Sequence, residues 1–150
     1  RFEPQGMTLA KALKSSTPII YTDTAFQALG YLWKINLNET AKHLAFSSVL
    51  PEAAHNEVTS FETKPKRFTA VFLEEPTMDT FVKRSMGAYR TVIAHAGVAA
   101  IRIPLTGTSF EKKTWNGIAL AIATARALAR LKRVDPRKTR LIDELKRLVR

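Results

Sequence analysis

Short apolar, β-branched runs alternate along the chain with longer segments whose apolar residues recur at helical spacing. Continuous apolar runs of this length are typical of strands buried on both faces of a sheet. They cover residues 17–23, 43–50, 68–73 and 98–105. Apolar side chains three and four positions apart share one side of a helix, so the intervening segments predict helices. These helices are expected over residues 25–38, 78–95 and 110–132.

Residues that cap helices indicate where several of these helices begin. Asp23 or Thr24 can cap the helix after the first strand, and Ser109 can cap the long helix near the end of the chain. Asp135 followed by Pro136 is typical of an N-cap and a first helical position. We therefore expect a last helix to open at this Asp-Pro pair.

The alternation of strands and helices predicts the fold class. Strands separated by helices of more than ten residues form βαβ crossovers, which place neighbouring strands parallel and cover both faces of the sheet with helices. The sequence therefore predicts an α/β domain, and 150 residues are enough for one such domain. Ligands of these folds bind outside the carboxyl ends of the strands, so the segments that follow the strands are the candidates for chemistry.

Composition excludes several classes of protein. The chain is 45% hydrophobic and 25% charged, which is typical of a globular domain. It contains no cysteine, which excludes a disulfide scaffold, a cysteine metal site and a cysteine nucleophile. The longest apolar run, around residues 118–125, is far shorter than the roughly 20 residues of a membrane span. We expect a cytoplasmic protein without a membrane partner.

The net charge of +11 is concentrated toward the end of the chain. Residues 111–150 contain twelve Lys or Arg and four Asp or Glu, whereas residues 1–110 contain twelve and nine. Such a basic segment raises the hypothesis of nucleic-acid binding. No aromatic residue follows Trp115, so the basic segment lacks the stacking surface of a single-strand binder. We therefore do not expect a nucleic-acid partner, although a basic interaction domain acting through residues 132–150 stays open.

Two polar segments contain candidate catalytic residues. Residues 38–42 end a predicted helix and include Glu39, while residues 51–57 follow a predicted strand and include His55. An aldose–ketose isomerase needs one group that moves a proton between adjacent carbons and another that opens the sugar ring, and a carboxylate and an imidazole suit these tasks. Either segment could reach the ligand side of the sheet. A solvated glutamate and a structural histidine remain the alternative.

The same segments match family motifs. Residues 18–21 read P-I-I-Y, residues 38–42 read N-E-T-A-K and residues 51–57 read P-E-A-A-H-N-E. They resemble the P-V-I-Y, N-E-N-S-K and P-E-x-x-H-N-E motifs in the C-terminal half of the bifunctional phosphoglucose/phosphomannose isomerases. Residues 134–146 are similar to the Asp-Pro helix at the end of that family. The resemblance spans nearly the whole chain.

The resemblance implies a fold and a set of site residues. The fold would be a sugar isomerase (SIS) domain, a flavodoxin-like three-layer α/β/α sandwich with a mainly parallel sheet. Glu39 would be the base that moves a proton between C1 and C2 through a cis-enediol, and His55 would assist ring opening. Lys146 would act at the ring oxygen, and no metal or organic cofactor is implied. The substrate-binding residues would be Lys42, Asn56, Glu57 and Thr139.

The resemblance also implies partners. Residues 1–150 would form a single SIS domain, the C-terminal half of a protein with two such domains, and two chains would form a homodimer. The family holds the substrate phosphate in the other SIS domain, and His55 would reach a site completed by another subunit. Thr106–Ser109 is a weak substitute for that phosphate loop. A non-catalytic phosphosugar sensor is the main alternative function.

Three departures from the family motifs bear on substrate identity and catalytic competence. Thr40 and Ala41 replace Asn and Ser in the N-E-N-S-K motif, which removes the hydrogen bonds of those two side chains. Thr22–Asp23 replaces a glycine that usually follows the Tyr-containing strand, and Asn116 stands where an acidic residue is common. Glu39 and His55 are retained.

Overall fold

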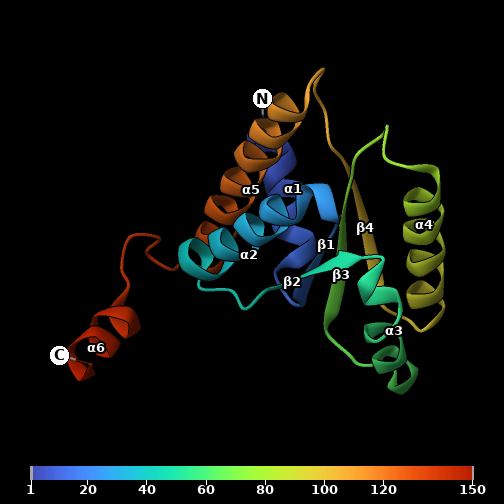
Figure 1. The fold of residues 1–150 in the computed structure, drawn as a ribbon. Coiled ribbons are helices and arrows are strands. Elements are labelled where there is room, and N and C mark those ends of the chain that lie inside the picture. Colours follow the sequence, from blue (N-terminus) through green and yellow to red (C-terminus); the bar gives the residue numbers. More distant parts are fainter. Residues whose placement is uncertain (1, 150) are drawn as a thin grey trace.

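The computed structural model describes residues 2–149 and contains one sheet of four parallel strands (Figure 1). The strands lie in the order β2-β1-β3-β4. Ile19 of β1 pairs with Phe46 of β2 and with Ala70 of β3, and Phe72 of β3 pairs with Arg102 of β4. The strands are β1 (Thr17–Asp23), β2 (Phe46–Leu50), β3 (Phe68–Glu74) and β4 (Ala99–Pro104).

Helices cover both faces of the sheet, which confirms the three-layer α/β/α sandwich (Figure 1). Side chains of a strand alternate between its two faces, so Ile20 and Val71 pack on one face while Tyr21 and Phe72 pack on the other. The first face is covered by α1 (Glu3–Leu13), α2 (Gln27–Ala41) and α5 (Phe110–Lys132). The second face is covered by α3 (Glu57–Ser60) and α4 (Thr80–His95).

Three of the helices begin at side-chain caps. Asp23 accepts a hydrogen bond from the Phe26 N–H at 2.9 Å and caps the 3-10 turn η1 (Thr24–Phe26) that leads into α2. Ser109 caps α5, as the sequence predicts, and Asp79 caps α4. All three caps follow a strand, so they lie beyond the carboxyl ends of the sheet.

Besides the one-turn helix α3, two helices differ from the sequence expectation. The helix α1 was not expected, yet it packs closely against α5. The expected opening of the last helix at Asp135–Pro136 is wrong, because α6 (Arg140–Leu148) begins several residues later. The Asp135 carboxylate instead accepts a hydrogen bond from the N–H of Arg137 at 2.9 Å, which makes a local Asx turn rather than a helix cap. Among residues 2–149, no helix is both long enough and apolar enough to cross a membrane.

Gly6 allows α1 to approach α5 closely. A Cβ at this position would lie 2.7 Å from the carbonyl carbon of Ala123 and 2.8 Å from the backbone nitrogen of Thr124. Backbone atoms cannot move as a flexible side chain can, so we expect Gly6→Ala to reduce the free energy of unfolding by about 1–3 kcal/mol. Urea denaturation at neutral pH measures this change.

Gly87 provides the matched control for this substitution. It lies inside α4, and a Cβ there would meet no atom within 4 Å. Alanine favours a helix interior over glycine, so Gly87→Ala should stabilise the domain by about 0.5–1 kcal/mol. Equal effects of the two substitutions would contradict the close approach of α1 and α5.

Candidate functional site

Glu39 lines an open cavity of about 730 Å³ between the end of α2 and the segment that leads to α6. The carboxylate is exposed, and two other predicted site residues, Lys42 and Thr139, line the same cavity. The remaining lining residues are Asn38, Val134, Asp135, Lys138, Arg140, Leu141 and Ile142. The structure therefore brings together three of the seven predicted site residues.

Backbone contacts hold the end of α2 in place beside the cavity. Lys42 ends the helix in the left-handed conformation with φ 49°, and its backbone N–H donates to the Leu37 carbonyl. Its ammonium group donates to the carbonyl of Glu39, while Lys132 of α5 donates to the Lys42 carbonyl at 2.7 Å. The side chain of Asn38 pairs with the backbone of Ala45 through its amide oxygen at 2.8 Å. These contacts fix the backbone that carries Glu39.

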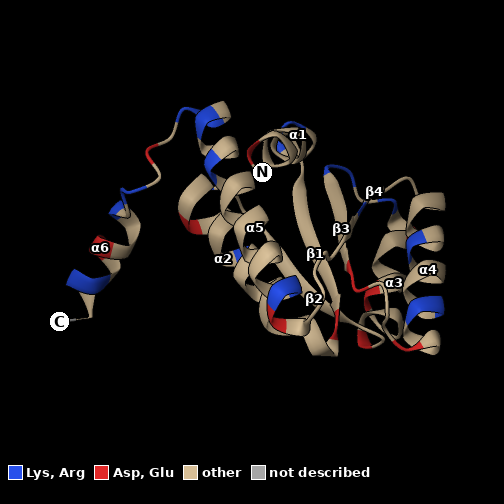
Figure 2. Cartoon of the chain, turned by 90° about the horizontal axis from the view of Figure 1, so that it is seen from above, with Lys and Arg blue, Asp and Glu red and all other residues tan. Residues whose placement is uncertain are grey.

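Lys and Arg recur along α6 and the segment that leads to it (Figure 2), and some of them line the cavity. Lys138 and Arg140 line it, and neither was among the site residues expected from the sequence. Their position in the basic run after Asp135 is the signal that could have found them. Cations beside a cavity favour an anionic ligand and stabilise negative charge that develops on it.

His43 follows Lys42 at the start of the loop before β2, and Lys132 contacts both residues. Its Nε2 is 2.7 Å from the Ser16 carbonyl, and Lys132 donates to its Nδ1 at 3.3 Å. This arrangement requires the neutral ring with a proton on Nε2. Burial lowers the pKa of His43, and the nearby Lys132 ammonium lowers it further.

The lowered pKa of His43 predicts a loss of stability in acid. The unfolded chain takes up the histidine proton below about pH 6.5, whereas the folded state resists it. The contribution is therefore complete above that pH and is lost as the pH falls. We expect His43→Gln to reduce the difference in unfolding free energy between pH 7.5 and pH 5.5, because glutamine can donate to Ser16 without titrating. His95→Gln, at an exposed histidine of α4, should leave the wild-type difference unchanged.

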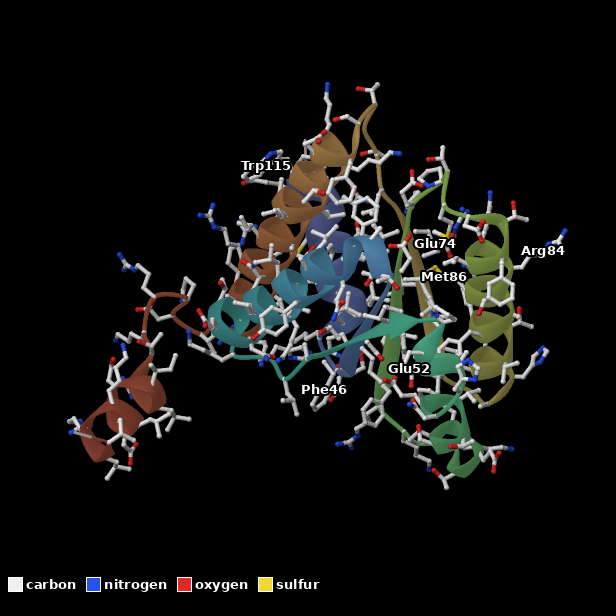
Figure 3. All side chains as sticks on the ribbon, in the orientation of Figure 1. Phe46, Glu52, Glu74, Arg84, Met86 and Trp115 are labelled. Atoms are coloured by element: carbon white, nitrogen blue, oxygen red, sulfur yellow. The ribbon has the colours of Figure 1, made fainter. Side chains whose placement is uncertain are left out.

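His55 lies in a separate part of the chain, just after β2. Pro51 starts the 3-10 turn η2 (Glu52–Ala54), and the backbone N–H of His55 closes this turn on the Glu52 carbonyl at 2.9 Å. Glu52, labelled in Figure 3, accepts a hydrogen bond from the Asn56 side chain at 2.9 Å. His55 and Asn56 are both exposed.

Within one chain, Glu39 and His55 lie at opposite ends of the sheet. The helix α2 returns the chain from the carboxyl end of β1 to the amino end of β2, so Glu39 lies at the amino end. His55 follows the carboxyl end of β2, and the five residues of that strand alone span roughly 16 Å. The interpretation that residues 38–42 could reach the carboxyl-end side of the sheet is therefore wrong. The long returning helix is the reason.

Lys146 lies on α6, which projects away from the rest of the domain (Figure 1). Every described residue of α6 is exposed, including the large apolar side chains Leu141, Leu145 and Leu148. Lys146 consequently does not line the Glu39 cavity in this structure. Among residues 2–149, no group of three or more His, Asp or Glu side chains could hold a metal ion.

A family model describes nearly the whole chain. Residues 2–149 match the bacterial phospho-glucose isomerase C-terminal SIS domain. The chain belongs to this family. The resemblance in its motifs is thereby confirmed, and the architecture described above is that of an SIS domain.

Curated relatives of this SIS domain are bifunctional phosphoglucose/phosphomannose isomerases. The protein of Thermoplasma acidophilum is 25% identical over 132 residues, which are 88% of this chain and 42% of the relative. The protein of Aquifex aeolicus is 24% identical over 144 residues, 95% of this chain and 45% of the relative. This SIS domain thus spans less than half the length of these relatives.

Solved structures share the fold. A glucose-6-phosphate isomerase like protein from Thermus thermophilus superposes with a TM-score of 0.69 and 22% identity, covering 87% of this chain and 44% of that one. The C-terminal domain of glucosamine-fructose-6-phosphate aminotransferase from Francisella tularensis gives a TM-score of 0.71 with 11% identity, covering 92% and 42%. At these identities the likeness establishes the SIS fold alone.

Proposed function

We propose that this SIS domain takes part in the aldose–ketose isomerisation of phosphosugars and supplies the catalytic base. The reaction would interconvert glucose 6-phosphate or mannose 6-phosphate with fructose 6-phosphate. The main support is the exposed carboxylate of Glu39 in a cavity of about 730 Å³ that basic side chains also line. The names of the curated relatives, which are isomerases of both sugars, agree with it.

In the proposed reaction, the Glu39 carboxylate removes the proton from C2 of the open-chain aldose. The C2–H electron pair then forms the C1–C2 double bond of a cis-enediol, and the carbonyl oxygen at C1 takes up a proton. Return of the proton from Glu39 to C1, with loss of the O2 proton, gives the ketose. Lys42, Lys138 and Arg140 would stabilise the negative charge on the substrate, and Thr139 would contact it near C2.

The proposed histidine partner must reach Glu39 from elsewhere. Since His55 lies at the opposite end of the sheet from Glu39 in one chain, the complete site would combine Glu39 of one copy with His55 of a second copy. Ring opening by His55 would then occur at an interface between the two copies. Lys146 lies on the helix α6, and the exposed apolar face of this helix would be covered in the same assembly. We therefore propose a homodimer. A different SIS domain, in the same longer chain or in a partner chain, would hold the substrate phosphate.

Isomerisation in deuterium oxide tests this proposal. The full-length protein that contains this domain is incubated with fructose 6-phosphate, and the products are analysed by proton NMR. Transfer through an exchangeable base should give glucose 6-phosphate and mannose 6-phosphate that carry deuterium at C2. Binding of the sugar phosphate without any turnover would contradict the proposal and favour a sensor.

A further inference from the structure

We propose that Glu57 is a positioning residue, which fixes the segment that carries His55 on the sheet through Tyr21 and Ser48 and does not contact substrate. The inference rests on the proposed function for its consequence in catalysis. The structural claim, that the Glu57 carboxylate orients residues 51–63, can be tested without any activity.

One side of this segment faces the sheet. Ala53, Glu57 and Phe61 recur at every fourth position, and Ala53 and Phe61 are 1% and 3% exposed. The Glu57 carboxylate bonds Tyr21 and Ser48 of the sheet, so Glu57 lies in this inner row between Ala53 and Phe61. His55 and Asn56 are exposed on the outside of the segment. Fixing the inner row therefore also fixes the direction in which His55 points.

Hydroxyl groups occupy both oxygens of the Glu57 carboxylate. The Tyr21 hydroxyl donates to Oε2 at 3.1 Å, and the Ser48 hydroxyl makes a short hydrogen bond to Oε1. Tyr89 of α4 donates to the Tyr21 hydroxyl at 3.1 Å. These hydrogen bonds form a network that ends on Glu57. Every bond of the network is made when Glu57 is ionised and accepts from both hydroxyls.

The tyrosines hold their protons and cannot meet a substrate. Tyr21 is 0% exposed and Tyr89 is 3% exposed, and both rings pack around Phe72 in the core. Burial raises the pKa of Tyr21, and it raises the pKa of Tyr89 to about 12. Both hydroxyls therefore remain donors at neutral pH. Each oxygen of the Glu57 carboxylate thus has a protein donor that stays protonated, on the side of the segment that faces the sheet.

A carboxylate in an otherwise apolar row has a structural consequence. Apolar contacts have no direction, so Ala53 and Phe61 alone would hold the segment but leave its rotation free over a range of angles. Hydrogen bonds require defined distances and angles. The bonds from Tyr21 in β1 and Ser48 in β2 thus set the rotation and register of residues 51–63 against two strands.

Three substitutions separate positioning from substrate contact in the full-length enzyme. We expect Glu57→Ala and Tyr21→Phe each to lower kcat for cyclic glucose 6-phosphate about tenfold or more, because a hydrogen bond to a charged group is lost. Glu57→Gln should stay within about threefold, since the amide oxygen can accept from Tyr21 and Ser48 can turn to accept from the amide N–H. Glu62→Ala, at an exposed carboxylate of the same segment, is the matched control.

The double variant Tyr21→Phe with Glu57→Ala adds a coupling test. If both residues act through one contact, the double variant should be no slower than the worse single variant. A Glu57 that binds substrate directly would make Glu57→Gln as slow as Glu57→Ala and leave Tyr21→Phe silent. Either of those results would overturn the proposal.

Hydrogen exchange of the 150-residue chain tests the positioning itself. Glu57→Ala and Tyr21→Phe should each accelerate amide exchange over residues 51–63 at least fivefold, with Glu57→Gln and Glu62→Ala close to wild type. Unchanged exchange in Glu57→Ala would overturn the proposal. If the wild-type enzyme shows no isomerase activity while exchange responds as expected, the proposed function fails and the positioning role of Glu57 stands.

Discussion

Replacing Glu39 with glutamine is expected to slow isomerisation by the full-length enzyme about 10²–10⁴-fold, the usual loss when a general base is removed. Glutamine has the shape of glutamate but cannot accept the C2 proton. The fold should survive, because Glu39 is exposed and its contact with Lys42 is made by the backbone carbonyl. Substrate binding should change little, so the loss should fall on kcat rather than on KM.

Two further measurements make the Glu39 result specific. Deuterium from the solvent should no longer enter C2 of bound sugar, because that exchange depends on the same base. The control Glu62→Gln, an exposed glutamate far from the cavity, should retain the wild-type rate. If Glu39→Gln kept near-normal turnover, Glu39 would not be the base, and the cavity would need another function.

The strands and most helices could be predicted because local pattern and tertiary environment agree. Tyr21 and Ile20 are both fully buried although they face opposite sides of the sheet, and a continuous apolar run is what such a two-sided strand requires. The caps at Asp23 and Ser109 could be read for a similar reason, since each side chain bonds a backbone N–H within three residues.

The ends of the chain could not be predicted by the same means. The helix α1 contains Gly6, which weakens a helical pattern, and its stability depends on packing against α5 far along the chain. Close packing against α5 requires a glycine at position 6. The same glycine lowers the helix propensity of the segment, which is why the sequence pattern does not predict α1. At Asp135, a helix cap and an Asx turn use the same side chain, and the local turn formed.

The candidate site shows how chain topology can separate two residues that are close in the sequence. Glu39 and His55 are sixteen positions apart in the sequence, which suggests one pocket. The fifteen residues of α2 carry the chain roughly 22 Å back along the sheet before β2 begins, which places Glu39 at the far end from His55. Helix length and strand order together could have predicted this separation. The positions of Lys138 and Arg140 beside the cavity depend on the turn at Asp135, so they could not have been predicted in this way.

The 150-residue chain alone is expected to show little or no isomerase activity, although it contains Glu39 and His55. The chain spans 42–45% of the isomerases that it resembles. Much of the rate of such an enzyme comes from using the binding energy of a remote phosphate to hold the reacting carbons against the base. Basic side chains near the cavity would attract a phosphosugar, but a general electrostatic field would not orient it.

Side-chain caps already occupy N–H groups at the three helix starts that follow β1, β3 and β4. A phosphate binds at a helix N-terminus through free backbone N–H groups and the positive end of the helix dipole. Asp23 and Asp79 occupy the N–H groups at the starts of η1 and α4, and Ser109 occupies one at the start of α5. Burial raises the pKa of Asp23, and the nearby carboxylate of Glu75 raises it further. A phosphate there would meet carboxylates already in place.

Adding an SIS domain that binds phosphate is expected to restore the reaction. In a coupled assay with fructose 6-phosphate, we expect the chain alone to turn over at least a thousandfold more slowly than the order of 10 s⁻¹ that is ordinary for an enzyme. Full-length protein, or the chain mixed with an SIS domain that binds phosphate, should approach that rate. The same chain carrying Glu39→Gln should gain nothing from the added domain, because the base would still be absent. Turnover of order 10 s⁻¹ by the chain alone would mean that these 150 residues contain a complete active site, including a phosphate-binding site.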